Sequence, residues 1–297
     1  MIQLLHGKGC GGCWEYMDKF FKMKFFICII IAIIVMTVMA FGYLFTNPFY
    51  SKLIIKLIDN QSYEDLEKAC RLPFANINAS PAVSPTLRKV VELPEKLVPL
   101  NYACSKNDLK AVEILLKNKA DPNADGNLQT SKPFPLEIAA SHGNLDMIKL
   151  LIEYGADVEE QAIKAIEAQL KYGVRTGTVD IESFKSTVSL FVQHGFVANK
   201  TNLNGESIFL SSAIYSNIEV SKFLVSEIGL DTQAQNNNGQ TALHLVCISG
   251  WISEPSVEYI EFLIDSGIDP RIKDKYGKTA YDYAIERGNY SIAELLR

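Results

Sequence analysis

Apolar residues recur at helical spacing through most of the chain beyond residue 95. In five short runs they lie three or four positions apart, namely AVEILLK, MIKLLIE, STVSLFVQ, VSKFLVSE and YIEFLID. This spacing gathers apolar side chains on one side of a helix. The pattern predicts a series of short amphipathic helices, each too small to bury an apolar face without a neighbour.

A turn string follows each of these runs. The strings are NKADPNA at 118–124, YGADVEE at 154–160, HGFVANK at 194–200, IGLDTQA at 228–234 and SGIDPRI at 266–272. Four of them carry Gly at the second position, which suits a left-handed residue after a helix. Lys119 stands at that position in the first string, so we expect a strained or non-standard turn there.

A second string alternates with the turn and opens the next helix: VPLNYAC at 98–104, FPLEIAA at 134–140, GESIFLSSA at 205–213, GQTALHLVC at 239–247 and GKTAYDYA at 277–284. Two motifs in fixed order are characteristic of a repeat protein. They resemble the T-P-L-H-x-A helix start and the G-A-D-x-N turn of the ankyrin repeat. His244 and Asp282 lie at the His position of that helix start.

The resemblance implies an all-α ankyrin-repeat solenoid of stacked helix–turn–helix units with short β-hairpin loops. About six units would occupy residues 98–297. Residues 46–97 are predicted to form a cap-like ankyrin unit followed by a proline-containing linker. The unit at 160–199 departs from the pattern because it lacks the T-P-L-H string and carries extra residues.

An uncharged stretch of 21 residues, 25–45, precedes the repeats. As a helix it would span a hydrocarbon core of ~30 Å, which predicts a single transmembrane helix or signal anchor after a short tail at 1–24. Lys8, Lys19, Lys22 and Lys24 precede it, against Lys52 and Lys56 beyond it. This bias favours a cytoplasmic N-terminus and an ankyrin domain on the exported side of the membrane.

In a second interpretation the ankyrin domain is also exported, but it is not held by a membrane anchor. If translation starts at Met23 rather than Met1, the apolar stretch is a signal peptide with a small-residue cleavage site near Ala40. The product would be a secreted, soluble ankyrin inhibitor, immunity protein or effector. Cys10 and Cys13 form a single CxxC pair in the tail, which lacks the second ligand pair of a structural zinc site.

Composition and motifs indicate a binding protein and not an enzyme. A net charge of −5 argues against a nucleic-acid partner. We find no catalytic, cofactor or metal motif, and therefore predict no enzyme activity, no cofactor and no metal. A less favoured alternative places an enzyme site in the divergent unit 160–199. Cys70, Cys104 and Cys247 are expected to be free thiols. Cys104 and Cys247 occupy a small, buried position of the repeat and lie several repeats apart, too far for a disulfide.

The family resemblance implies a protein partner held by the concave face and the hairpin tips. The candidate partner-binding residues are the polar and aromatic side chains of the predicted tips. They are Asn123, Asp125, Asn202, Asn204, Gln235, Asn236, Asn237, Lys273, Lys275 and Tyr276.

Overall fold

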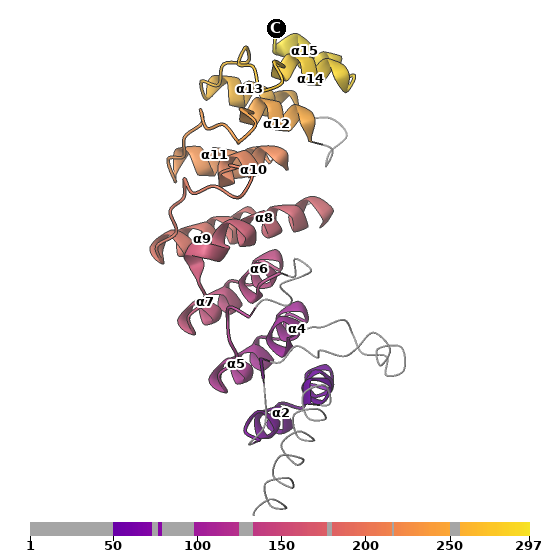
Figure 1. Ribbon diagram of the computed structural model, residues 1–297, viewed down its shortest axis with the longest axis vertical. Helices are drawn as coiled ribbons and strands as arrows, with labels where there is room; N and C mark the ends of the chain where they lie inside the picture. Colours follow the sequence, from indigo (N-terminus) through magenta and orange to yellow (C-terminus); the bar gives the residue numbers. More distant parts are fainter. Residues whose placement is uncertain are drawn as a thin grey trace, which may run out of the picture.

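The computed structural model is a stack of antiparallel helix pairs (Figure 1). It describes residues 50–72, 77–78, 98–124, 133–176, 180–215, 217–249 and 256–297. These residues are helical or irregular and include no strand. The prediction of an all-α fold is confirmed for this part of the chain.

Six helix pairs follow one another in the described residues from 98 onward. The first helices are α4 (Pro99–Ser105), α6 (Pro135–Ser141), α8 (Val158–Thr176), α10 (Ile208–Ile214), α12 (Ala242–Ile248) and α14 (Ala280–Glu286). The second helices are α5 (Leu109–Lys117), α7 (Leu145–Glu153), α9 (Ile181–Gln193), α11 (Ile218–Ser226), α13 (Val257–Asp265) and α15 (Tyr290–Leu295). A helical segment at 50–59 and α2 (Tyr63–Cys70) precede them.

Among the second helices, α5, α7, α9, α11 and α13 begin at side-chain caps supplied by the sequence, whereas the cap residue of α15, Asn289, makes no such bond. Asp108 accepts a hydrogen bond from the backbone of Ala111, and Asn144 accepts one from Met147. Asp180, Asn217 and Ser256 cap α9, α11 and α13 in the same way. Each cap satisfies a backbone N–H that the helix itself leaves without a partner.

Packing follows the stack direction, with first helices against first helices and second against second. Helix α6 contacts α4 and α8, while α5 contacts α2 and α7. Leu115, Leu151 and Phe191 lie fully buried on successive second helices. Because neighbours cover each apolar face, burial is shared between units and is not confined within one.

Buried contacts between units include polar ones, and one of them is a chain of three hydroxyl groups. Ser212 and Ser221 lie 2.7 Å apart, and the hydroxyl of Tyr259 lies 2.7 Å from Ser221. All three side chains are fully buried. The chain of hydroxyls ends on the carbonyl of Phe209, so it ties α10, α11 and α13 together with its polar groups satisfied.

The divergent unit departs from the repeat in two ways. Helix α8 starts at Val158, directly after the turn at Gly155, so the hairpin expected between α7 and α8 is absent. The residues that depart from the motif lengthen α8 to 19 residues and α9 to 13. The expectation of a hairpin loop in every unit was therefore wrong at this position.

The predicted transmembrane helix at 25–45 and the tail at 1–24 lie outside the described residues. Across the ranges that the structure does describe, no helix combines the length and apolar character needed to cross a membrane. Cys70, Cys104 and Cys247 are buried free thiols, as predicted. Cys10, Cys13 and Cys28 lie in the undescribed N-terminal part.

Lys119 occupies the left-handed region with φ +72°, where the matching residue of the next unit is Gly155 at φ +93°. A side chain at positive φ costs about 1 kcal/mol relative to Gly. We therefore expect Lys119→Gly to raise the free energy of unfolding of the protein by about 1 kcal/mol, measured by urea titration with circular dichroism.

Gly155→Lys is the matched reverse change, since no atom lies within 4 Å of a Cβ built at Gly155 and only the backbone is tested. It should lower stability by a similar amount. A Lys119→Gly protein no more stable than the wild type would contradict the assignment of strain to this turn.

Candidate functional site

Three tips with the same turn project between the later helix pairs: residues 202–206, 236–240 and 274–278. Each begins with Asn or Asp and has Gly at its fourth position. In the middle tip the side chain of Asn236 accepts hydrogen bonds from the backbone of Asn238 and Gln240, at 2.9 and 3.0 Å. Asn202 and Asp274 close their turns with equivalent bonds.

Backbone hydrogen bonds join these tips into a ladder. The N–H of Asn237 donates to the carbonyl of Asn204, and the N–H of Lys275 donates to that of Asn238, both at 2.9 Å. Close approach requires glycine at Gly205, since a Cβ there would lie 2.8 Å from the backbone nitrogen of Asn237. The tips therefore stand side by side at a fixed spacing.

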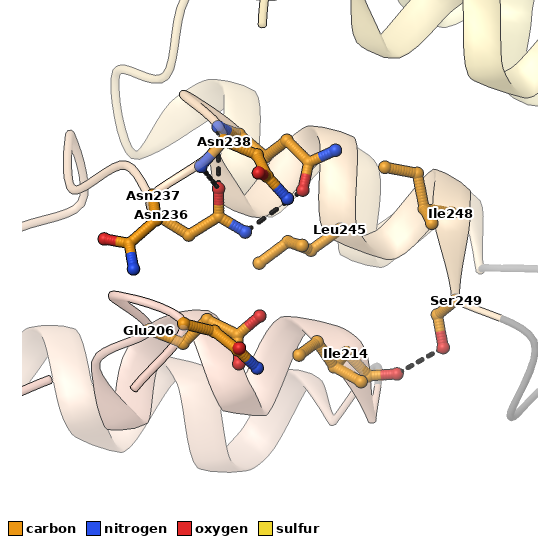
Figure 2. Close-up of a pocket in the computed structure, with 10 residues that line it drawn as sticks. Glu206, Ile214, Asn236, Asn237, Asn238, Leu245, Ile248 and Ser249 are labelled. Carbon is orange, nitrogen blue, oxygen red and sulfur yellow. Dashed lines mark hydrogen bonds between the residues drawn. The ribbon is translucent and has the colours of Figure 1, made fainter. Parts of the chain in front are cut away.

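A groove of about 420 Å³ lies under the first two of these tips, between α10 and α12 (Figure 2). Ile214, Leu245 and Ile248 supply its apolar surface. Its polar lining is made largely of amides, together with one carboxylate and one hydroxyl: Asn204, Glu206, Asn236, Asn237, Asn238, Gln240 and Ser249. We call this site the amide groove.

The chemistry of the amide groove suits an extended peptide. Side-chain amides both donate and accept hydrogen bonds, as a peptide backbone does. The amides of Asn236, Asn237 and Gln240 already form bonds within and between the tips, which leaves Asn204 as the exposed amide whose side chain is not used in this way. The lining includes no Lys, Arg or His, and Glu206 is the residue that carries charge. Apolar side chains of a bound segment would lie against Ile214, Leu245 and Ile248.

A half-buried carboxylate fixes the first tip to the divergent unit. Glu167 of α8 accepts hydrogen bonds from Asn202 and Ser211, both at 2.9 Å, and Asn202 also donates to Glu206. Burial raises the pKa of Glu167, and the two hydrogen bonds act in the opposite direction. Burial and these two carboxylates raise the pKa of Tyr215 to about 12.

The structure brings only some of the predicted partner-binding residues to one place. Asn204, Asn236 and Asn237 line the amide groove, where Asn204 and Asn237 are exposed. The side chains of Asn202 and Asn236 accept the hydrogen bonds that close their own turns. Gln235, Lys273, Lys275 and Tyr276 are exposed, and Asp125 lies outside the described residues.

Asn123 has a structural role that the sequence analysis did not predict. Its amide donates to the carbonyl of Gly155 at 2.9 Å and accepts from the backbone of Asp157 at 2.7 Å. Asn78 makes the same two contacts with Lys119 and Asp121, one unit earlier. Asn123 therefore links neighbouring turns.

No catalytic arrangement is visible in the described part of the divergent unit. Among the described residues, no group of three His, Cys, Asp or Glu side chains is placed to hold a metal ion. Burial raises the pKa of Cys247 to about 12 and that of Cys70 to about 11, so these thiols are poor nucleophiles. The enzyme alternative gains no support from these groups.

Comparison with known proteins identifies the repeat. The family model described as ankyrin repeats (3 copies) matches residues 75–162 and 228–297, together more than half of the chain. The chain belongs to the ankyrin-repeat family. The two matched ranges leave out most of the divergent unit and the pair that follows it.

The curated relatives that match this chain have different names, and the match covers only part of each. The chain is similar to potassium channel AKT1 of Arabidopsis thaliana, 28% identical over 203 residues, which are 67% of this chain and 22% of the channel. It is 25% identical over 232 residues to the ankyrin repeat and KH domain-containing protein mask-1 of Caenorhabditis elegans, covering 70% of this chain and 9% of that one. The aligned part is thus less than a quarter of either relative.

The ankyrin helix start at Thr241 also anchors the tip of the next repeat. The backbone N–H of Thr241 donates to Nδ1 of His244 at 3.2 Å, and Nε2 of the same ring lies 3.2 Å from the carbonyl of Lys278. These two bonds require the neutral imidazole, with Nε2 protonated. Burial lowers the pKa of His244, which agrees with that form.

This arrangement predicts a pH effect on stability. The folded pKa of His244 lies below its unfolded value of about 6.5, so the stabilisation it gives is complete above that pH. It is lost as the pH falls from about 6.5 through the folded pKa. His244→Gln, which can still form a capping box, should flatten the dependence of unfolding free energy on pH between neutral and about pH 5.

Asp282 is the matched control, because it occupies the same position in the next unit and its pKa is lowered by hydrogen bonds from Thr279. Its stabilisation is present above an unfolded pKa of about 3.9 and is lost as the pH falls below that value. Asp282→Asn should change only this more acidic range. Equal pH profiles for the wild type and His244→Gln above pH ~5 would contradict the neutral assignment.

Proposed function

We propose that this ankyrin-repeat protein is a non-catalytic binding protein whose tips and first helices hold a protein partner. The observation that carries the proposal is the amide groove, with its apolar surface and a polar lining in which amides predominate and Glu206 supplies one carboxylate. Family membership supports it, since the repeat is shared by proteins with otherwise unrelated names. No cofactor and no nucleic acid enter the proposal.

Asn204 offers a direct test of the groove. It is exposed, and no hydrogen bond from its side chain contributes to the turn, whose ladder contact uses its backbone carbonyl. Asn204→Arg places bulk and charge at the mouth of the groove. We expect the full-length protein with this change to hold its partner at least about tenfold more weakly, a loss of about 1.4 kcal/mol.

Asn60→Arg is the control, because Asn60 is an exposed asparagine in the N-terminal helical unit, away from the groove. The partner is first captured by a photo-cross-linker placed at residue 237 and identified by mass spectrometry. Its affinity is then measured for the wild type and both variants. Equal affinity for Asn204→Arg and Asn60→Arg would argue against binding in the groove.

We further propose that residues 25–45 anchor the protein as a single transmembrane helix, with the ankyrin repeats on the exported side. The support is the length and lack of charge of this stretch and the excess of lysines before it. The alternative is a secreted protein cleaved near Ala40. Both place the repeats outside the cytoplasm.

Two measurements on the full chain separate these outcomes. Protease added to intact cells should digest the repeats, and alkaline washing of the membranes should leave the chain bound. Digestion only after the cells are opened would reverse the proposed orientation. A mature N-terminus at Phe41, found by sequencing, would favour the secreted form over the anchor.

A further inference from the structure

A second groove, of about 370 Å³, lies at the C-terminal end of the stack. Its lining comprises Pro270, Arg271, Lys273, Thr279, Tyr281, Leu296 and Arg297. Three of these side chains are cationic and none is acidic, whereas the chain as a whole carries a net charge of −5. We call this site the basic groove.

Two of the three cations, Arg271 and Lys273, come from the segment before the last tip. Lys273 and Lys275 are exposed and Asp274 between them is buried, as expected where successive side chains of an extended backbone point to opposite sides. Asp274 accepts hydrogen bonds from the hydroxyl of Tyr283 at 2.7 Å and from Gln240 at 3.3 Å. The carboxylate of Asp274 is therefore buried and bonded inside the fold, whereas the side chains of Lys273 and Lys275 are exposed.

The cations of the basic groove are not all equally available. Arg271 is paired with Asp269 through two bonds of 3.0 and 3.2 Å. Lys273 and Arg297 make no ion pair with another residue in the described ranges. Lys273 lies close enough to Asp282 to lower its pKa, but that carboxylate is bonded to Thr279 at 2.8 Å. Lys273 is thus an exposed cation of the basic groove that has no direct ion pair in the described ranges, although the charge of Asp282 acts on it from nearby.

Apolar surface accompanies this charge. Pro270 and Tyr281 are half-buried in the wall, and Leu296 lies almost fully buried beside them. A peptide that alternates carboxylates with apolar side chains would satisfy both kinds of surface. A nucleic acid offers phosphate charge without aliphatic side chains, and the acidic character of the whole chain opposes a long polyanion.

We propose that the basic groove binds an acidic, extended segment of the protein partner, with Lys273 as the principal contact to its carboxylates. This rests on the proposed function, because it assumes that the partner is a protein. It adds the chemistry of a second contact at the end of the stack, distinct from the amide groove between α10 and α12, whose lining contains no cation.

The test uses the full-length protein and a short fluorescein-labelled peptide in which Glu and Leu alternate. Fluorescence anisotropy should show binding that weakens as salt rises. Lys273→Glu should weaken it at least about tenfold, and Lys273→Gln by less. Lys149→Glu makes the same charge change on α7, far from the groove in sequence, and should leave binding unchanged.

Each remaining outcome counts against the proposal. Equal binding of a Gln–Leu peptide would show that charge is not recognised. Stronger binding of single-stranded oligothymidine, lost in Lys273→Glu, would assign the basic groove to nucleic acid. Lys273 is exposed, and thermal unfolding of the variants should match that of the wild type. If the captured partner needs Asn204 but is indifferent to Lys273→Glu, the basic groove fails while the proposed function stands.

Discussion

Stacking between neighbouring helix pairs is the interaction on which the rest of this structure depends. A helix such as α7 buries Ile148 and Leu151, but the atoms that cover them come from α5 and α9 as well as from its own unit. No pair has a closed core, so stability is a sum over interfaces between units. The divergent unit keeps both interfaces, with α6 and α10 against α8, although its hairpin is missing.

Polar links repeat with the same period as the apolar ones and fix the distance between units. Asn78 bonds the turn at Lys119, and Asn123 bonds the turn at Gly155. In the later part of the stack Gln233 donates to the carbonyl of Gly267 at 2.9 Å. Each amide replaces water on a turn backbone that the stack partly buries, which holds the turns in register.

The sequence predicted the helices because their apolar period and turn strings are local signals. It could not predict the length of α8, since the residues beyond the motif could have formed a loop as easily as the roughly three extra turns that make this helix 19 residues long and not 7. Asn123 looked available for binding because its bond to Gly155 spans 32 positions of chain. Lys119 is the opposite case, where the motif alone located a left-handed residue.

The amide groove was also only partly predictable from local sequence signals. Asn204, Asn236 and Asn237 were identified because tip residues stand out as polar strings, but the apolar surface beneath them was not. Ile214, Leu245 and Ile248 belong to the helical pattern that elsewhere fills the core. Only the offset between α10 and α12 decides which apolar positions remain accessible, and that offset depends on stacking.

Within each tip the fold and the binding surface use different positions. The first residue is Asn202, Asn236 or Asp274, and its side chain is needed to close the turn. The second residue is Leu203, Asn237 or Lys275, which are all exposed, and its side chain takes no part in the bonds that close its own turn. An apolar, an amide and a cationic side chain therefore occupy equivalent places along one ladder. Closure of the turn places no demand on this side chain, so its chemistry differs from tip to tip. Asn237 and Lys275 use this freedom for a second purpose, because their side chains donate to Leu203 and Asn238 of the preceding tip and so contribute to the contact between units.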